Sequence, residues 1–163
     1  MVVGSGGGGK TTLARRLAEV TGLPLTHLDR EFWNPGWVKT PTEEWHAKVA
    51  TFAAADRWIL EGNYGGSAHL RLARADTVVF LDFGRLTCMR RALTREIRNW
   101  GTCAQAPGCP ERFSAEFLKW IWDYPKQGRV RMLNAIAEHG SGAQVISLRS
   151  DAEVEAFLVD VDS

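Results

Sequence analysis

The amino-acid sequence predicts an α/β fold with three layers, in which a five-stranded parallel sheet lies between helices on both faces. Short apolar runs alternate with segments of helical spacing along the 163 residues. Strands of a parallel sheet read as continuous apolar runs because both of their faces are buried. No internal repeat or long linker divides the sequence, so we expect one domain over residues 1–163.

Three strands and two helices are expected in the first half of the chain. Leu13, Leu17 and Val20 recur at helical spacing and Gly22 follows them, which indicates a helix that ends there. Residues 32–41 are rich in Trp, Pro and Gly and are expected to form an irregular loop. The predicted strands are residues 1–3, 24–29 and 57–60, and the predicted helices are residues 11–20 and 42–55.

The second half adds two strands and four helices. Its clearest helix, residues 85–100, carries an apolar stripe made of Leu86, Met89, Leu93, Ile97 and Trp100. Ser114 is expected to cap the next helix, and Pro125 to interrupt it. The tryptophans at 45, 58, 100 and 122 fit core positions. The remaining strands are residues 77–81 and 144–148, the remaining helices are residues 114–124, 128–139 and 151–159, and residues 101–113 form a loop.

The bulk composition argues against several classes of protein. Twenty basic residues against nineteen acidic residues give a net charge of +1, which disfavours binding to nucleic acid or to a membrane surface. No apolar run approaches the roughly 18 residues of a membrane span. The three cysteines, an odd number, suggest no disulfide framework. We therefore expect a soluble, cytoplasmic protein that is a monomer or a homodimer.

A glycine-rich loop follows the first predicted strand, with the spacing G-x-x-x-x-G-K-T. Its glycines let backbone N–H groups form a concave nest for an anion, and the dipole of the next helix points at the same place. Lys10 can reach the β- and γ-phosphates of a triphosphate, and the Thr11 hydroxyl can ligate Mg²⁺. The motif predicts that ATP and Mg²⁺ bind at Gly4, Ser5, Gly6, Gly7, Gly8, Gly9, Lys10, Thr11 and Thr12.

The strand before this loop is unusually short. Only three residues precede Gly4, whereas a strand usually has about five or six. Either the strand is stunted or the natural start of the protein lies upstream.

Acidic residues close three of the predicted strands. Glu61 and Asp82 each end an apolar run, and an acid in such a place can hold Mg²⁺ through water. Spacing alone does not choose between them. Asp29 could orient or deprotonate an attacking group of the acceptor, and Asn63 and Tyr64, which follow Glu61, are expected to contact that acceptor.

Arginines gather on either side of the long loop 101–113. Arg91, Arg95 and Arg98 lie opposite the apolar stripe of their helix, where they form either a solvated face or a set of charges that closes on the transferred phosphate. Arg112 and Arg129 could join them. Trp33 and Trp37 are either packed loop anchors or an aromatic platform for a planar acceptor. The four histidines form no spaced cluster and receive no catalytic role.

In combination, five segments of the sequence resemble a known family. They read L-P-L-T-H-L-D, F-W-N-P-G-W, W-I-L-E-G-N-Y, A-D-T-V-V-F-L-D and A-P-G-C-P-E-R-F, at residues 23–29, 32–37, 58–64, 75–82 and 106–113. The family is that of the DNA topology modulation proteins (FlaR-like), in the adenylate-kinase-like group of P-loop proteins. The resemblance implies a five-stranded parallel sheet, an acceptor-binding region at residues 29–55 and a lid insertion at residues 101–113. The acid of the third strand in this family is usually Asp, whereas this chain has Glu61.

These features lead to a kinase as the first hypothesis. The chain would transfer the γ-phosphoryl group of ATP to a small molecule, with Lys10, Asp29, Arg91 and Arg95 in catalysis. The acceptor could be a nucleoside monophosphate, a nucleoside, a sugar or an antibiotic, and the two loop tryptophans slightly favour a planar one. The alternative is a nucleotide-binding regulatory protein or ATPase that affects DNA topology or gene expression without a small-molecule acceptor.

Overall fold

Five parallel strands form the central sheet of the protein, whose computed structural model describes residues 1–162. The strands are β1 (Val2–Gly4), β2 (Leu25–His27), β5 (Ile59–Glu61), β6 (Thr77–Leu81) and β7 (Gln144–Leu148). Their order across the sheet is β2-β5-β1-β6-β7, and every pairing is parallel. The predicted five-stranded parallel sheet is therefore confirmed, and β1 lies at its centre.

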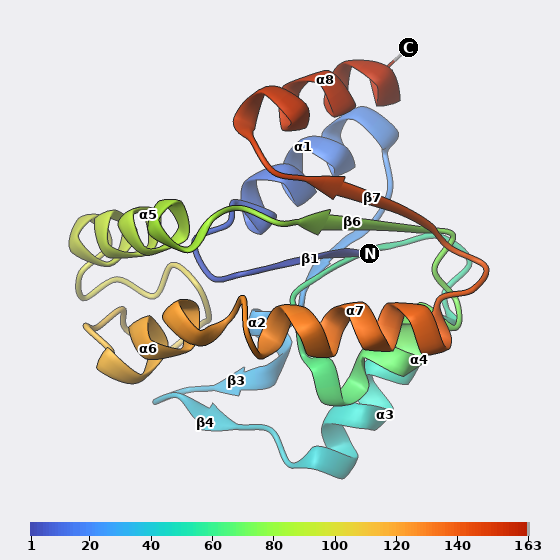
Figure 1. Cartoon of the computed structure of the whole chain (residues 1–163). Helices are drawn as coiled ribbons and strands as arrows, with labels where there is room; N and C mark the ends of the chain where they lie inside the picture. Colours follow the sequence, from blue (N-terminus) through green and yellow to red (C-terminus); the bar gives the residue numbers. More distant parts are fainter. Residues whose placement is uncertain (163) are drawn as a thin grey trace.

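Helices cover both faces of the sheet (Figure 1). On one face lie α1 (Lys10–Thr21) and α8 (Asp151–Asp162), and on the other lie α3 (Thr42–Ala54), α4 (Ala68–Leu72) and α7 (Gly128–His139). Neighbouring residues of β1 face different layers: Val2 packs in the core beneath α1 and α8, and Val3 packs in the core with α4 and α7. This alternation explains why every residue of β1 is apolar or glycine.

Two helices project beyond the carboxyl ends of the strands, to which the arrowheads of Figure 1 point. They are α5 (Arg85–Arg98) and α6 (Ala115–Asp123), which pack against each other. Ser114 caps α6 as predicted, because its hydroxyl accepts a hydrogen bond of 3.1 Å from the Phe117 amide. These helices enclose the carboxyl edge of the sheet, where ligands of parallel sheets usually bind.

Three short segments differ from the sequence prediction. The second strand ends at His27, and Asp29 lies in the first turn of a five-residue helix, α2 (Leu28–Phe32). The segment 32–41 is a small hairpin of β3 (Trp33–Asn34) and β4 (Val38–Lys39) rather than an irregular loop. A 3₁₀ turn, η1 (Gly65–Ser67), leads into α4, which was not predicted. Elements this short carry too few residues to establish a period.

The two ends of the apolar stripe predicted over residues 85–100 face solvent, which contradicts the core position assigned to Trp100. Met89, in the middle of the stripe, packs partly buried against the core. Leu86 is 72% exposed, Ile97 is 76% exposed and Trp100 is 65% exposed. The buried side of α5 instead carries Cys88, Ala92 and Glu96. Cys88 and Ala92 are small, and at these two positions the backbone of α5 approaches Gly7 of the glycine loop closely. This close approach, rather than hydrophobic periodicity, decides which side of α5 is buried. Trp122 on α6 is also exposed rather than in the core.

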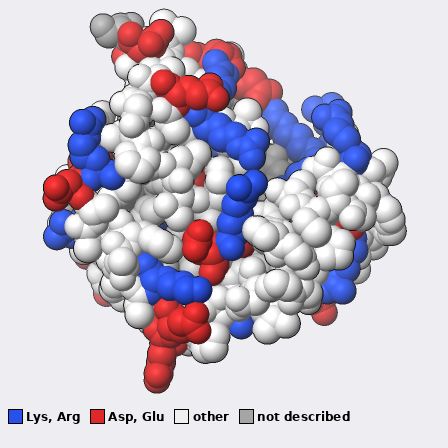
Figure 2. Space-filling model, turned by 180° about the vertical axis from the view of Figure 1, so that it is seen from behind, with Lys and Arg blue, Asp and Glu red and all other residues white. Residues whose placement is uncertain are grey.

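The charges are distributed unevenly over the molecule. Residues 85–131 contain ten Lys and Arg but only four Asp and Glu. Figure 2, seen from behind, shows acidic side chains gathered at the top of the molecule, over α8. The near-neutral total therefore conceals a basic segment around α5, α6 and the start of α7. Within residues 1–162, no helix combines the length and the apolar content needed to cross a bilayer.

Two isoleucines on neighbouring helices test the orientation of α5. Ile97→Ala should change the free energy of unfolding by no more than about 0.5 kcal/mol, because its side chain is already in water. Ile121→Ala on α6 should cost about 2–5 kcal/mol, because Ile121 is fully buried against α5. Urea unfolding followed by circular dichroism measures both, and equal costs would contradict the exposed stripe.

Candidate functional site

The glycine loop between β1 and α1 forms a backbone cradle. Gly4, Gly7 and Gly9 have φ of 145°, 73° and 89°, values that L side chains rarely adopt. Gly9 caps α1 without a side-chain hydrogen bond, and the first turn of α1 contains no acidic residue. The amino end of the helix dipole is therefore not neutralised by the chain itself, as an anion site requires.

Three neighbours hold this loop in place. A side chain at Gly7 would put its Cβ 2.1 Å from the Cys88 carbonyl oxygen of α5. A Cβ at Gly6 would lie 2.7 Å from the ring of Phe117 on α6. On the third side, the Asn63 side-chain amide makes two hydrogen bonds to Gly4. It accepts one from the Gly4 N–H at 3.0 Å and donates one to the Gly4 carbonyl at 2.6 Å. Asn63, predicted to contact the acceptor, thus fastens the loop.

Lys10 and Thr11 lie where the motif predicts them, next to the acid of the adjacent strand. The Lys10 ammonium donates to the Ser5 carbonyl at 3.0 Å. The Thr11 hydroxyl donates to Glu61 Oε2 at 3.3 Å, although β5 is about fifty residues away in the chain. Parallel pairing of β5 with β1 produces this contact, so the sheet itself brings Glu61 to the loop.

Glu61 is almost fully buried yet kept ionised. His27 Nδ1 lies 2.9 Å from Oε2, the oxygen that Thr11 also contacts, so both neighbours use one oxygen of the carboxylate. Burial by itself would raise the pKa of Glu61. The hydrogen bond from His27, the charge of Lys10 and the bond from Thr11 act in the opposite direction, and the resulting pKa lies below its ordinary value.

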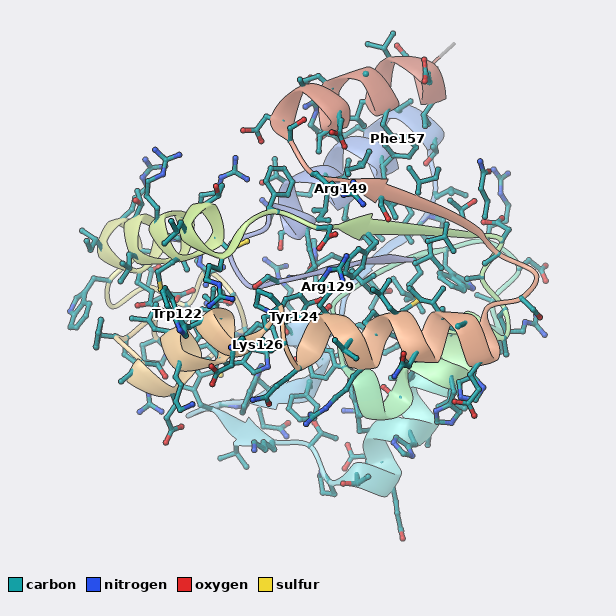
Figure 3. The ribbon with its side chains drawn as sticks, viewed as in Figure 1. Trp122, Tyr124, Lys126, Arg129, Arg149 and Phe157 are labelled. Carbon is teal, nitrogen blue, oxygen red and sulfur yellow. The ribbon has the colours of Figure 1, made fainter. Side chains whose placement is uncertain are left out.

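Asp82, the other acid considered for the metal, is engaged by arginines. Arg129 donates to both of its oxygens, from Nε at 2.8 Å and from Nη2 at 2.9 Å. Arg149 Nε lies 3.8 Å from the same carboxylate. Figure 3 labels these arginines, which reach the sheet edge from α7 and from the end of β7. The structure therefore places Asp82 and Arg129 in an ion pair, and Arg129 is not free for a substrate.

Asp29 is linked to the loop after β5. The Tyr64 hydroxyl donates to Asp29 Oδ1 at 2.6 Å. Burial and the charge of Asp29 raise the pKa of Tyr64 far above its ordinary value, so the phenol remains a donor. Beneath it, the fully buried guanidinium of Arg71 donates to the carbonyls of Gly62, Asn63 and Tyr64. Tyr64 has a φ of 38°, and these bonds hold it there.

Trp33 and Trp37 connect the hairpin to the loop 101–113. The Trp37 indole donates to the Pro110 carbonyl at 3.0 Å, and its ring meets Trp33 edge to face at 5.5 Å. The Gly36 amide donates to the Gly108 carbonyl at 2.9 Å. Of the two predicted roles for these tryptophans, this geometry corresponds to loop anchors. The loop 101–113 thus lies against the predicted acceptor region.

The predicted arginines other than Arg129 have different surroundings. Arg91 pairs with Asp151 at the start of α8, at 2.6 and 2.8 Å, and its guanidinium lies over the ring of Phe83. Arg95 lies over the Phe117 ring, and its buried Nε and Nη2 have no hydrogen-bond partner among the described residues. Arg98 and Arg112 are exposed. Arg95 is therefore a half-buried cation with two unused donor atoms near the ring that packs on Gly6.

A hollow of about 250 Å³ adjoins the glycine loop on the side of α8. Gly8, Gly9 and Thr12 line its loop side. Phe83, Arg91 and Asp151 line the opposite side, with Arg16 and Glu155 among the further lining residues. Thr12 thus lies beside the predicted triphosphate position.

Sequence reasoning missed His27 and Arg71. His27 lies one strand away from the glycine loop, and its partner Glu61 is 34 residues distant, so only parallel pairing of β2 with β5 reveals it. Arg71 lies on the unpredicted helix α4. The rings of His46, His69 and His139 also come together, at centroid distances of 6.1 and 5.8 Å. Within the described residues, no group of three or more His, Cys, Asp or Glu is arranged to hold a metal ion.

Two solved structures have a similar fold, and one of them is described as a kinase. The chain is similar to a "putative kinase" from Chloroflexus aurantiacus J-10-fl, with a TM-score of 0.54 and 17% identity over 98% of this chain and 95% of that one. It is also similar to an uncharacterized protein from Eubacterium ventriosum ATCC 27560, with a TM-score of 0.51 and 14% identity over 100% and 99% of the two chains. At such identities the likeness shows a kinase-like fold.

The comparisons with families and curated proteins gave no match. No protein-family model matches the chain, and neither does any curated protein. Neither structural neighbour carries the DNA topology description implied by the sequence resemblance. The kinase-like part of that resemblance is thus supported, and its DNA topology part is not.

The lowered pKa of Glu61 predicts an acid-sensitive contribution to stability. A carboxyl whose folded pKa lies below its unfolded value stabilises the fold above the unfolded value, 4.5 here, and loses this contribution as the pH falls below it. The difference in free energy of unfolding between the native chain and Glu61→Gln should therefore shrink between pH 7 and pH 3. Urea titrations at each pH measure it, and parallel curves would contradict the assignment.

Proposed function

We propose that this chain is an ATP-dependent phosphotransferase that transfers the γ-phosphoryl group to a small-molecule acceptor. The observation that carries the proposal is the glycine loop with Lys10 and Thr11, held beside the ionised Glu61 of the neighbouring strand. The kinase-like fold of the solved neighbours agrees with it. Membership of the adenylate-kinase-like group, with residues 101–113 as a lid, is part of the same proposal.

The donor triphosphate would lie on the glycine loop. Its backbone N–H groups and the amino end of α1 suit an anion. Within the described residues, the hydrogen bond of the Lys10 ammonium goes to the neutral Ser5 carbonyl, which a phosphate oxygen would replace. The hollow beside Phe83 and Arg91 opens directly from Gly8 and Gly9. It would take the nucleoside end of ATP, because an aromatic and guanidinium wall suits a planar base.

Magnesium would be held by Thr11 directly and by Glu61 through water. Glu61 uses a single oxygen for its two protein neighbours, whereas both oxygens of Asp82 accept hydrogen bonds from Arg129. This difference favours Glu61 over Asp82. A bound Mg²⁺ neutralises charge on the phosphates and fixes their orientation. His27 keeps Glu61 oriented for that contact.

Catalysis would rest on positioning and charge, as phosphoryl transfer requires. Lys10 would neutralise charge on the phosphates. Arg95 would stabilise the transferred group, because its two unpartnered nitrogens are the kind of donor that a phosphate oxygen satisfies. Arg91 would remain with Asp151 at the nucleoside end. Asp29 would meet the acceptor, and the segments 29–55 and 101–113 would enclose it.

Removing the ammonium of Lys10 tests the donor site. Lys10→Ala should lower kcat for ADP release by a hundredfold or more, at about the magnitude seen when one charge-stabilising donor is lost. Lys126→Ala, an exposed lysine between α6 and α7 (Figure 3), is the matched control and should retain activity. Turnover is measured by coupled detection of ADP with a metabolite panel. Full activity of Lys10→Ala would refute the proposed function.

A pair of amide variants tests the metal assignment. Glu61→Gln should raise the Mg²⁺ concentration for half-maximal turnover about 10–100-fold, the cost of losing an outer-sphere metal partner. Asp82→Asn should leave that concentration nearly unchanged and should lower thermal stability, because Arg129 loses a charged partner. Magnesium titrations of initial rate distinguish the two. A larger metal effect in Asp82→Asn would reverse the assignment.

A further inference from the structure

The acid on the acceptor side of the site, Asp29, is paired with no cation in the part of the chain that the structure describes. Asp29 is half-buried in the first turn of α2, and the only hydrogen bond of its side chain among the described residues comes from Tyr64. No Lys, Arg or His of residues 1–162 forms an ion pair with it. Its second oxygen, Oδ2, accepts nothing from the protein and remains available for a ligand.

Two arginines near this region, Arg71 and Arg129, have other partners. Arg71, the buried arginine of this region, uses Nη1 and Nη2 on three backbone carbonyls. Arg129 is held by Asp82. Arg30 follows Asp29 on α2 but is exposed, and consecutive residues of a helix point about 100° apart. A phosphate monoester on the acceptor would need a guanidinium fork or an ammonium, and here it would meet the carboxylates of Asp29 and Glu61.

Aromatic rings form the wall behind Asp29. Tyr64 lies between Phe32 and Trp45, with ring centroids 4.8 Å from each. Trp45 is buried, and its indole donates to the Ser67 hydroxyl at 3.1 Å, so this wall is fixed. An apolar wall beside an oriented carboxylate suits a molecule with a hydroxyl on a planar or ring-shaped body. It strengthens a hydrogen bond between the two, because the local dielectric is low.

We propose that the acceptor is an alcohol that carries no phosphate, such as a nucleoside or a sugar, and that Asp29 receives its proton. This inference rests on the proposed phosphotransferase function. The acceptor oxygen forms a bond to the γ-phosphorus, and the bond from that phosphorus to the β–γ bridging oxygen breaks. ADP leaves with the electron pair of that bond. The hydroxyl proton goes to Asp29 Oδ2 and from there to solvent.

The substrate class is tested with matched pairs of acceptors. Nucleosides and monosaccharides are each compared with their monophosphates, and ADP release is measured above the rate without acceptor. We expect turnover with a nucleoside or with a monosaccharide, at a kcat/KM at least tenfold above that of the corresponding monophosphate. Preference for a monophosphate overturns the inference and leaves the proposed function standing. A rate that no acceptor raises refutes the proposed function itself.

Asp29→Asn tests the role of the carboxylate with little change of shape, because the amide oxygen can still accept from Tyr64. It should lower kcat by about 10²–10⁴, the usual contribution of a general base, and leave the Kd for Mg²⁺-ATP unchanged in calorimetry. Asp56→Asn, an exposed acid before β5, is the control and should match the native rate. Unchanged kcat, or an equal loss of ATP affinity, would overturn the assignment of Asp29.

Discussion

The close approach of the glycine loop to its neighbours is the constraint on which the rest of the structure depends. Because Gly7 leaves no space between its backbone and the Cys88 carbonyl, α5 must turn its smallest residues toward the loop. Leu86 and Ile97 then lie on the outer side of α5, exposed to solvent. A second contact positions α6, whose Phe117 ring packs on Gly6 and lies beneath the guanidinium of Arg95. Two contacts of the loop thus position two helices and the half-buried Arg95.

The three acids at the carboxyl edge of the sheet differ in the charged and hydrogen-bonding groups that surround them. Glu61 is surrounded by a histidine, a lysine and a hydroxyl, which keep it charged despite burial. Asp82 is bound between two arginines and serves to anchor α7 and the segment after β7. Asp29 has only a phenol. Carboxylates that look equivalent in the sequence therefore have different capacities, since the number of donors already satisfied differs at each.

How much of the fold and of the site could be predicted depends on how far apart in the sequence the interacting residues lie. The bounds of β6, β7 and α7 were predicted correctly because a run of mainly apolar residues marks each of these strands, and helical spacing that stops at Gly140 marks α7. The glycine loop was predicted because its whole chemistry lies within eight adjacent positions. The partner of Glu61 was missed, since His27 meets it only after β2 and β5 pair. Asp82 and Arg129 were both selected for ligand or metal contacts, and only the fold brings them to each other.

The exposure of the tryptophans has a spectroscopic consequence. Trp100, Trp120 and Trp122 are accessible to water, and all three lie at the end of the molecule formed by α5, α6 and their connection, whereas Trp45 is sealed in the core. Indole emission shifts to longer wavelength in water and is quenched by small solutes that reach the ring. The red edge of the fluorescence spectrum therefore reports mainly on this end of the protein, and a change in its quenching by acrylamide signals an event that covers it, without a label or a substitution.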